Sequence, residues 1–163
     1  MIKTVAAHTS DFNRSSEGFD NGKYEGVACN ARLLEVRLVS SVYNAKVMSF
    51  MSAGLGDGTE LKQSYSGAPF GHSFVPEQGF AVGSYHWTAE IRAGRTKAMK
   101  LSTEYMVAYS GLKDAPEAYV ELYFKKLARF TTYPYFRAHF AMQVAASGLM
   151  LAPLPSLTDH RVD

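Results

Sequence analysis

Two residues of this sequence, His86 and Glu90, have side chains suited to acid–base or metal chemistry and fall within one regular pattern. They lie on the polar side of an alternating stretch, residues 81–92, which is typical of a strand with one apolar face. Alternate residues of a strand are about 7 Å apart, so side chains four positions apart cannot share a ligand without a partner strand. We interpret the row as a solvated strand face, and we expect no catalytic site and no metal site.

Four cations, Arg92, Arg95, Lys97 and Lys100, cluster around a predicted turn at residues 93–96 and could contact a phosphate backbone or an acidic polypeptide. A charged turn that keeps a sheet edge soluble is the simpler interpretation. The whole chain supports it, because 17 Lys and Arg residues stand against 15 Asp and Glu residues, a net charge of +2. Such a balance does not favour a nucleic acid as partner.

Motifs for other chemistry are missing from the sequence. His72 and His139 have no carboxylate at a useful spacing, and neither a glycine-rich nucleotide-binding motif nor a nucleophile elbow occurs. The single cysteine, Cys29, excludes an internal disulfide and a multi-cysteine zinc site, and it suits a reducing compartment. We therefore expect no cofactor, no enzymatic activity and a cytoplasmic location.

The composition predicts one folded domain preceded by an arm. The 163 residues are 47% hydrophobic and 20% charged, which is enough apolar material for a core and too little charge for a disordered chain. Residues 1–29 are rich in Ser, Asn, Gly and Asp, so we expect a flexible N-terminal arm there and a domain over residues 30–163. Pro153 and Pro155 interrupt the uncharged stretch at residues 138–158, which argues against membrane insertion.

Alternation of apolar and polar residues predicts three strands, and turn residues obscure a fourth. Residues 33–43 predict a strand with one buried face, and residues 81–91 and 99–109 predict an antiparallel hairpin. Residues 47–83 contain many glycines and two prolines, so we expect mostly turns there around one weaker strand near residues 60–66.

Two helices are predicted after the sheet. Asp114, followed three residues later by Glu117, is an N-cap signature for a helix that continues to about residue 129. Pro134 favours a break near residue 133 and the start of a second helix over residues 134–147. That helix is apolar on nearly all sides, more than one small sheet can cover, so we expect copies of the chain to associate. The residues expected at this oligomer interface are Tyr135, Phe136, Phe140 and Val144.

The segment Tyr133-Pro134-Tyr135-Phe136-Arg137 and the Leu- and Pro-rich run at residues 149–155 resemble the helix start and the following turn of the SecB-like export chaperones. The strand exit at residues 106–112 is similar to the last strand of that family. The resemblance implies an α+β fold, with a four-stranded antiparallel sheet packed by a long C-terminal helix, assembled as a homotetramer that is a dimer of dimers. It also implies client-binding residues in the turn, namely Leu149, Met150, Leu151 and Leu154.

Members of this family are ATP-independent holdases, so the resemblance implies a chaperone that binds unfolded or pre-secretory polypeptides through apolar grooves. The acidic surface with which export members dock the translocase motor is missing here, and Lys100 occupies one matched position. This argues against handover to the export motor and favours a specialised chaperone of the kind attached to toxin–antitoxin systems. Two other classes stay open: a hotdog-like thioesterase that uses Glu90 or His86, and a basic nucleic-acid-binding or scaffold module that uses Arg95 and Lys97.

Overall fold

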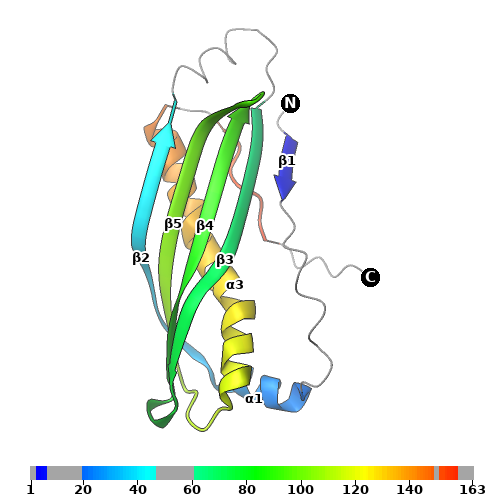
Figure 1. Ribbon diagram of the computed structural model, residues 1–163, viewed down its shortest axis with the longest axis vertical. Coiled ribbons are helices and arrows are strands. Elements are labelled where there is room, and N and C mark those ends of the chain that lie inside the picture. The colour runs from blue at the N-terminus through cyan, green and yellow to red at the C-terminus, as the bar shows by residue number, and fades with distance from the viewer. Residues whose placement is uncertain (1–2, 7–19, 47–60, 149–150, 158–163) are drawn as a thin grey trace.

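A sheet and one long helix form the two layers of the fold, as Figure 1 shows. The computed structural model describes the backbone of residues 3–6 and all atoms of residues 20–46, 61–148 and 151–157. Five strands pair in the order β1-β3-β4-β5-β2, and α3 crosses one face of this sheet. The elements are β1 (Lys3–Ala6), α1 (Asn21–Asn30), β2 (Arg32–Ala45), β3 (Leu61–Val75), the short 3-10 helix η1 (Pro76–Gln78), β4 (Phe80–Ala93), β5 (Thr96–Ser110) and α3 (Glu117–Ala146).

The four long strands are antiparallel, which confirms the expected α+β fold. β4 and β5 form the predicted hairpin, with Tyr85 opposite Tyr105 and Ala89 opposite Leu101. Gly94 turns the chain at φ +58°, a left-handed conformation that glycine adopts without a Cβ clash. The sequence pattern does not predict β1, a four-residue strand that pairs in parallel with β3.

β3 is much longer than predicted, because it accommodates the glycines and the proline that obscured its pattern. A Cβ at Gly67 would lie 2.5 Å from Cε3 of Trp87, so only glycine fits where β3 passes the indole. Pro69 pairs opposite Tyr85 of β4. It is tolerated because, among the described residues, no strand pairs with the outer edge of β3 at this position. A register shift accompanies Gly71 at φ +68°. Residues 47–60, also expected to form turns, lie outside the described residues.

α3 is one helix of 30 residues, so the predicted break near residue 133 is wrong. Proline inside a helix costs about 3 kcal/mol through a lost backbone hydrogen bond and a ring clash. Pro134 is exposed on the outer side, while Tyr133 and Phe136 beside it are buried, and this packing offsets the cost. The helix start also differs from the prediction. Asp114 lies before the helix at φ +61° and does not cap it, and the N-cap residue is Pro116.

Aromatic side chains fill the layer between the sheet and α3. Trp87 is 3% exposed and stacks on Phe136 with ring centroids 5.3 Å apart. Its Nε1 donates a hydrogen bond of 2.8 Å to Oγ1 of Thr132. Farther along the helix, Tyr109 of β5 packs edge-on against Phe124. Trp87 is the only tryptophan of the sequence, so its fluorescence reports on the contact between the sheet and α3.

Part of the predicted N-terminal arm is a helix that packs on α3. α1 begins after Asp20, whose side chain accepts a hydrogen bond of 2.9 Å from a backbone amide in the first turn. Val27 is its one buried residue, and the Tyr24 ring lies 6.4 Å from the ring of Tyr123 on α3. With so narrow an apolar face, α1 shows little periodicity in the sequence. Residues 1–2 and 7–19 of the arm lie outside the described residues.

Candidate polypeptide-binding and assembly surfaces

Large apolar side chains are exposed along β2, the strand at one edge of the sheet. The predicted buried face of this strand is therefore wrong for a single chain, because the described residues leave the outer edge of β2 uncovered. Two register shifts in its pairing with β5 add to the exposure by leaving Leu34 and Val39 outside the ladder. We name this surface the apolar edge: Leu33, Leu34, Leu38, Val39 and Val42, which are 50%, 57%, 41%, 55% and 54% exposed.

A second apolar surface follows the outer side of α3. Tyr135 and Met142 are 52% and 58% exposed, and Ala138 and Ala145 are exposed beside them. Steps of three and four residues place all four side chains on one side of the helix, and we name them the helix stripe. Among the described residues, no helix is long and apolar enough to cross a membrane. The stripe lies on the same helix whose residues Phe136, Phe140 and Val144 pack against the sheet.

Two polar contacts hold β2 against the second half of α3. Oγ of Ser41 lies 2.8 Å from Nε2 of His139, and the hydroxyl groups of Tyr43 and Ser147 hydrogen-bond to each other. Burial lowers the pKa of His139, which favours the neutral ring at physiological pH. These contacts fix the last part of β2 against α3.

The four residues predicted at an oligomer interface differ in their accessibility. Tyr135 is exposed in the helix stripe. Phe136, Phe140 and Val144 pack against the sheet of their own chain and are 0%, 1% and 5% exposed. In this conformation, Tyr135 is the one residue of the four that a second copy can contact directly.

The segment of residues 151–157 lies along α3 and is held there by its backbone. Leu154 is fully buried, and Nε of Arg137 donates a hydrogen bond of 2.6 Å to the Leu154 carbonyl. The Tyr133 hydroxyl donates to the carbonyl of Pro155. Burial, which is the largest influence, raises the pKa of Tyr133, so the hydroxyl keeps its proton and remains a donor at physiological pH. Main-chain oxygens and one leucine side chain therefore fix this segment.

An open hollow of about 240 Å³ continues beside this segment. The Tyr133 ring in its wall also contacts Tyr65 of β3, with ring centroids 5.5 Å apart, so the hollow lies on the β3 side of the helix. Its apolar walls and single guanidinium could accept an apolar side chain of an extended polypeptide. We name it the flank hollow; its lining residues are Phe130, Tyr133, Pro134, Arg137, Ser156 and Leu157.

The four residues predicted to bind clients lie on or just before this segment. Leu151 is partly buried and packs against the core beside the segment's start. Leu154 is 0% exposed, so it contacts its own chain in this conformation. Leu149 and Met150 lie outside the described residues. Sequence reasoning did not find the walls of the hollow on α3, although the motif at residues 133–137 contains three of them.

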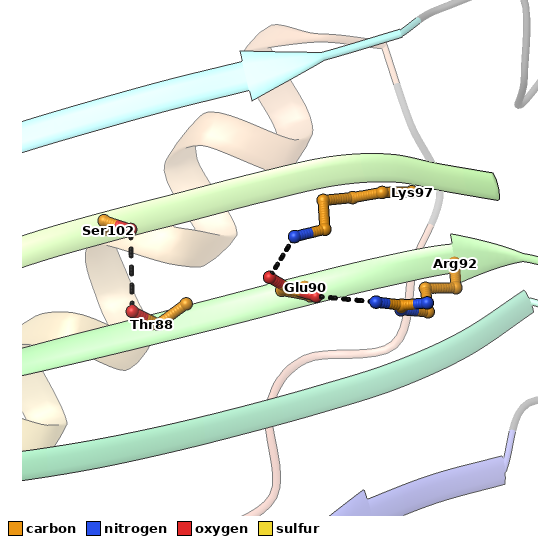
Figure 2. A network of polar contacts seen from close by, with 5 residues as sticks. All are labelled: Thr88, Glu90, Arg92, Lys97 and Ser102. Atoms are coloured by element: carbon orange, nitrogen blue, oxygen red, sulfur yellow. Dashed lines mark hydrogen bonds and ion pairs between the residues drawn. The ribbon is translucent and has the colours of Figure 1, made fainter.

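The outer face of the sheet is polar, and Figure 2 shows how its charges pair. Glu90 lies between two cations, with Oε1 2.5 Å from Nζ of Lys97 and Oε2 3.6 Å from a guanidinium nitrogen of Arg92. The hydrogen bond from Lys97 is the main cause that lowers the pKa of Glu90. Thr88 and Ser102 face each other on the same strands at 3.5 Å. Glu90 is therefore a charged, paired surface carboxylate.

These pairings bear on the alternatives drawn from the sequence. Nε2 of His86 lies 3.4 Å from a carboxylate oxygen of Glu104, and the Phe70 ring stacks on the imidazole at 4.5 Å. Glu90 pairs instead with Lys97 and Arg92, so the structure does not bring His86 and Glu90 into one site. Within residues 20–46, 61–148 and 151–157, no group of three His, Cys, Asp or Glu side chains could hold a metal ion. Glu90 also offsets part of the charge of the basic turn.

The antiparallel sheet and the long helix across it form a SecB-like architecture. A solved structure with this fold is the SecB-like chaperone Rv1957 of Mycobacterium tuberculosis, in complex with a ChAD peptide from the HigA1 antitoxin Rv1956. The two chains share 17% sequence identity with a TM-score of 0.68, and the match covers 84% of this chain and 97% of that one. The resemblance drawn from the sequence is thereby confirmed for the fold. No family model and no curated protein sequence matches the chain.

Proposed function

We propose that this protein is an ATP-independent holdase that keeps unfolded polypeptides from aggregating. The observation that carries the proposal is the apolar surface that the folded chain leaves uncovered, namely the apolar edge, the helix stripe and Phe70, which is 62% exposed. Contiguous apolar surface on a folded protein marks sites for other polypeptides. The fold adds support, because a SecB-like chaperone of the same architecture was solved with a peptide bound.

The apolar edge and the helix stripe are the surfaces we propose for assembly into a homotetramer. In the part of the chain that the structure describes, no strand pairs with the outer side of β2, so its backbone groups there can pair with a second copy. The alanines of the helix stripe allow another helix to approach closely between Tyr135 and Met142. Two different self-complementary surfaces on one chain produce a dimer of dimers. Phe136, Phe140 and Val144 then support the stripe from within the chain.

Clients bind, in this proposal, at the flank hollow and the segment beside it. Arg137 and Tyr133 fix the segment's backbone, so the wall that Leu157 adds to the hollow is in place before a client arrives. Leu149 and Met150 directly precede the segment in the chain. A preformed apolar wall of this kind recognises extended polypeptides with little dependence on their sequence.

A specialised client fits this chain better than the general export route. The structural neighbour was solved with a peptide of an antitoxin. In contrast, the outer sheet face of this chain pairs Glu90 with Lys97 and Arg92 and offers no acidic patch for an export motor in the described residues. We therefore propose a toxin–antitoxin-associated chaperone that acts in the cytoplasm on polypeptide clients, without a cofactor and without catalysis.

Aggregation of a chemically denatured model client, followed by light scattering without ATP, tests this function. The protein should suppress aggregation at a near-stoichiometric ratio. Leu157→Asp places a charge in the lining of the flank hollow and should reduce suppression several-fold, whereas Ala152→Asp adds the same charge at an exposed residue of the same segment and should not. Failure of the unaltered protein to protect several unrelated clients would overturn the proposal.

A further inference from the structure

β1 adds a parallel strand to the outer edge of β3 (Figure 1). Its four residues pair in register from Lys3 opposite Lys62 to Ala6 opposite Tyr65. The other three strand pairs of this sheet are antiparallel and much longer. Parallel pairs are slightly less stable per residue, and so short a strand makes few hydrogen bonds. β1 is therefore the most weakly held strand of the sheet.

Only the first half of β3 can accept a strand on this side. Pro69 has no amide hydrogen to donate, which interrupts the edge ladder. Gly71, at φ +68° beside a register shift, breaks the pairing geometry a little farther along. Residues 62–65, the part that β1 covers, thus lie in a short stretch of regular strand edge that ends at the proline.

A buried polar group at this stretch has no hydrogen-bond partner among the described residues. Gln63 is 3% exposed and points toward the helix side of the sheet, where its β4 partner Ile91 is fully buried. Its Nε2 makes no hydrogen bond within the part of the chain that the structure describes. Two positions farther, Tyr65 contacts Tyr133 in the wall of the flank hollow. The edge therefore lies beside a buried amide that a side chain of an added segment could accept a hydrogen bond from, and close to a wall of the hollow.

We propose that this edge of β3 is a strand-addition site for the backbone of an extended client, and that β1 occupies it until a client replaces it. The proposal rests on the proposed holdase function and adds how the client's main chain is bound. Strand addition supplies main-chain hydrogen bonds that do not depend on client sequence, while the flank hollow takes a side chain. Replacement of one short strand by another keeps the edge covered in both states, which protects the free protein from self-association at β3.

Binding of a short fluorescein-labelled peptide with alternating leucine and serine residues tests this site by fluorescence anisotropy. Thr4→Pro with Val5→Pro removes backbone donors from β1, and Thr4→Ala with Val5→Ala is the matched control that keeps them. If β1 covers the edge for most of the time, its release should raise peptide affinity about three- to tenfold, and the alanine control should change it little. A peptide with the same side chains but N-methylated at every amide should bind neither variant well, because neither of its edges can donate the hydrogen bonds of a strand pair.

A reversible lock provides a second test that does not depend on proline. Val5→Cys with Ser64→Cys, in a Cys29→Ser background, places two thiols at directly paired positions of β1 and β3. Oxidation should abolish peptide binding to the edge, and reduction should restore it. Circular dichroism of each variant verifies that the fold is retained.

The outcomes separate this proposal from the holdase function. Equal binding of the N-methylated and unmodified peptides, or unchanged affinity in the locked protein, overturns strand addition even where aggregation suppression is intact. Loss of both aggregation suppression and peptide binding in the unaltered protein overturns the holdase function and this proposal together.

Discussion

Thr132→Val should destabilise the fold although it replaces a hydroxyl by a methyl group of almost the same size in a fully buried position. Thr132 Oγ1 accepts the hydrogen bond from Nε1 of Trp87 and itself donates to the carbonyl of Ala128. Valine leaves the indole N–H buried without an acceptor, whereas the Ala128 carbonyl keeps its place in the helix ladder. Volume and apolar area hardly change, so the cost is that of one orphaned donor, about 1–3 kcal/mol.

Urea denaturation followed by the fluorescence of Trp87 measures this change, at a fixed protein concentration because assembly contributes to stability. Thr132→Ser is the matched control, because it keeps the hydroxyl and loses one methyl group, at about 1 kcal/mol. We expect Thr132→Val to be the less stable of the two. A valine variant as stable as the unaltered protein would refute the inference that this hydrogen bond anchors α3 to the sheet next to Pro134.

Two further predictions concern contacts elsewhere in the fold. Burial lowers the pKa of His139, so the folded chain binds fewer protons than the unfolded chain near and below pH 6.5, and stability present above that pH is lost as pH falls. Between about pH 7.5 and 5.5 the urea midpoint should fall less for His139→Gln than for the unaltered protein, and equal falls would remove His139 as the cause. Gly83→Ala should cost about 1–3 kcal/mol, since its Cβ would lie 2.5 Å from Cζ of Phe124 and 2.6 Å from the backbone oxygen of Gly71. Gly26→Ala, with nothing within 4 Å in helix α1, should instead stabilise by up to about 1 kcal/mol, and thermal unfolding that ranks the two variants the other way would contradict the packing described for Gly83.

The sheet hairpin and the fold class could be predicted from the sequence because their signals are local. Alternation over β4 and β5 identifies the buried side of each strand, and the residues predicted on it, Trp87 and Leu101 among them, are buried. Pro134 misled the prediction, since its local preference for ending a helix is outweighed by packing on both sides of it, which depends on tertiary structure. The length of β3 was underestimated for a related reason. Gly67 is typical of a turn in the sequence, but in the structure it makes room for the Trp87 indole of the neighbouring strand.

The candidate site was only partly predictable. The resemblance located the segment around Leu151 and Leu154, but it did not show that Leu154 is buried in its own chain. An alternating pattern on β2 predicts a buried side, yet it cannot tell whether the cover comes from the same chain or from another copy. The pairing of β1 with β3 joins residues about sixty positions apart through backbone groups alone, so no side-chain pattern predicts it.

The mass of the protein in solution, measured by size-exclusion chromatography with light scattering, tests most directly whether the uncovered apolar surface serves other polypeptide chains. We expect an assembly of four chains of 18.0 kDa, and a smaller species for Tyr135→Arg with Met142→Arg, which places charges in the helix stripe. A stable monomer of 18.0 kDa that leaves the apolar edge and the helix stripe in water would contradict the account.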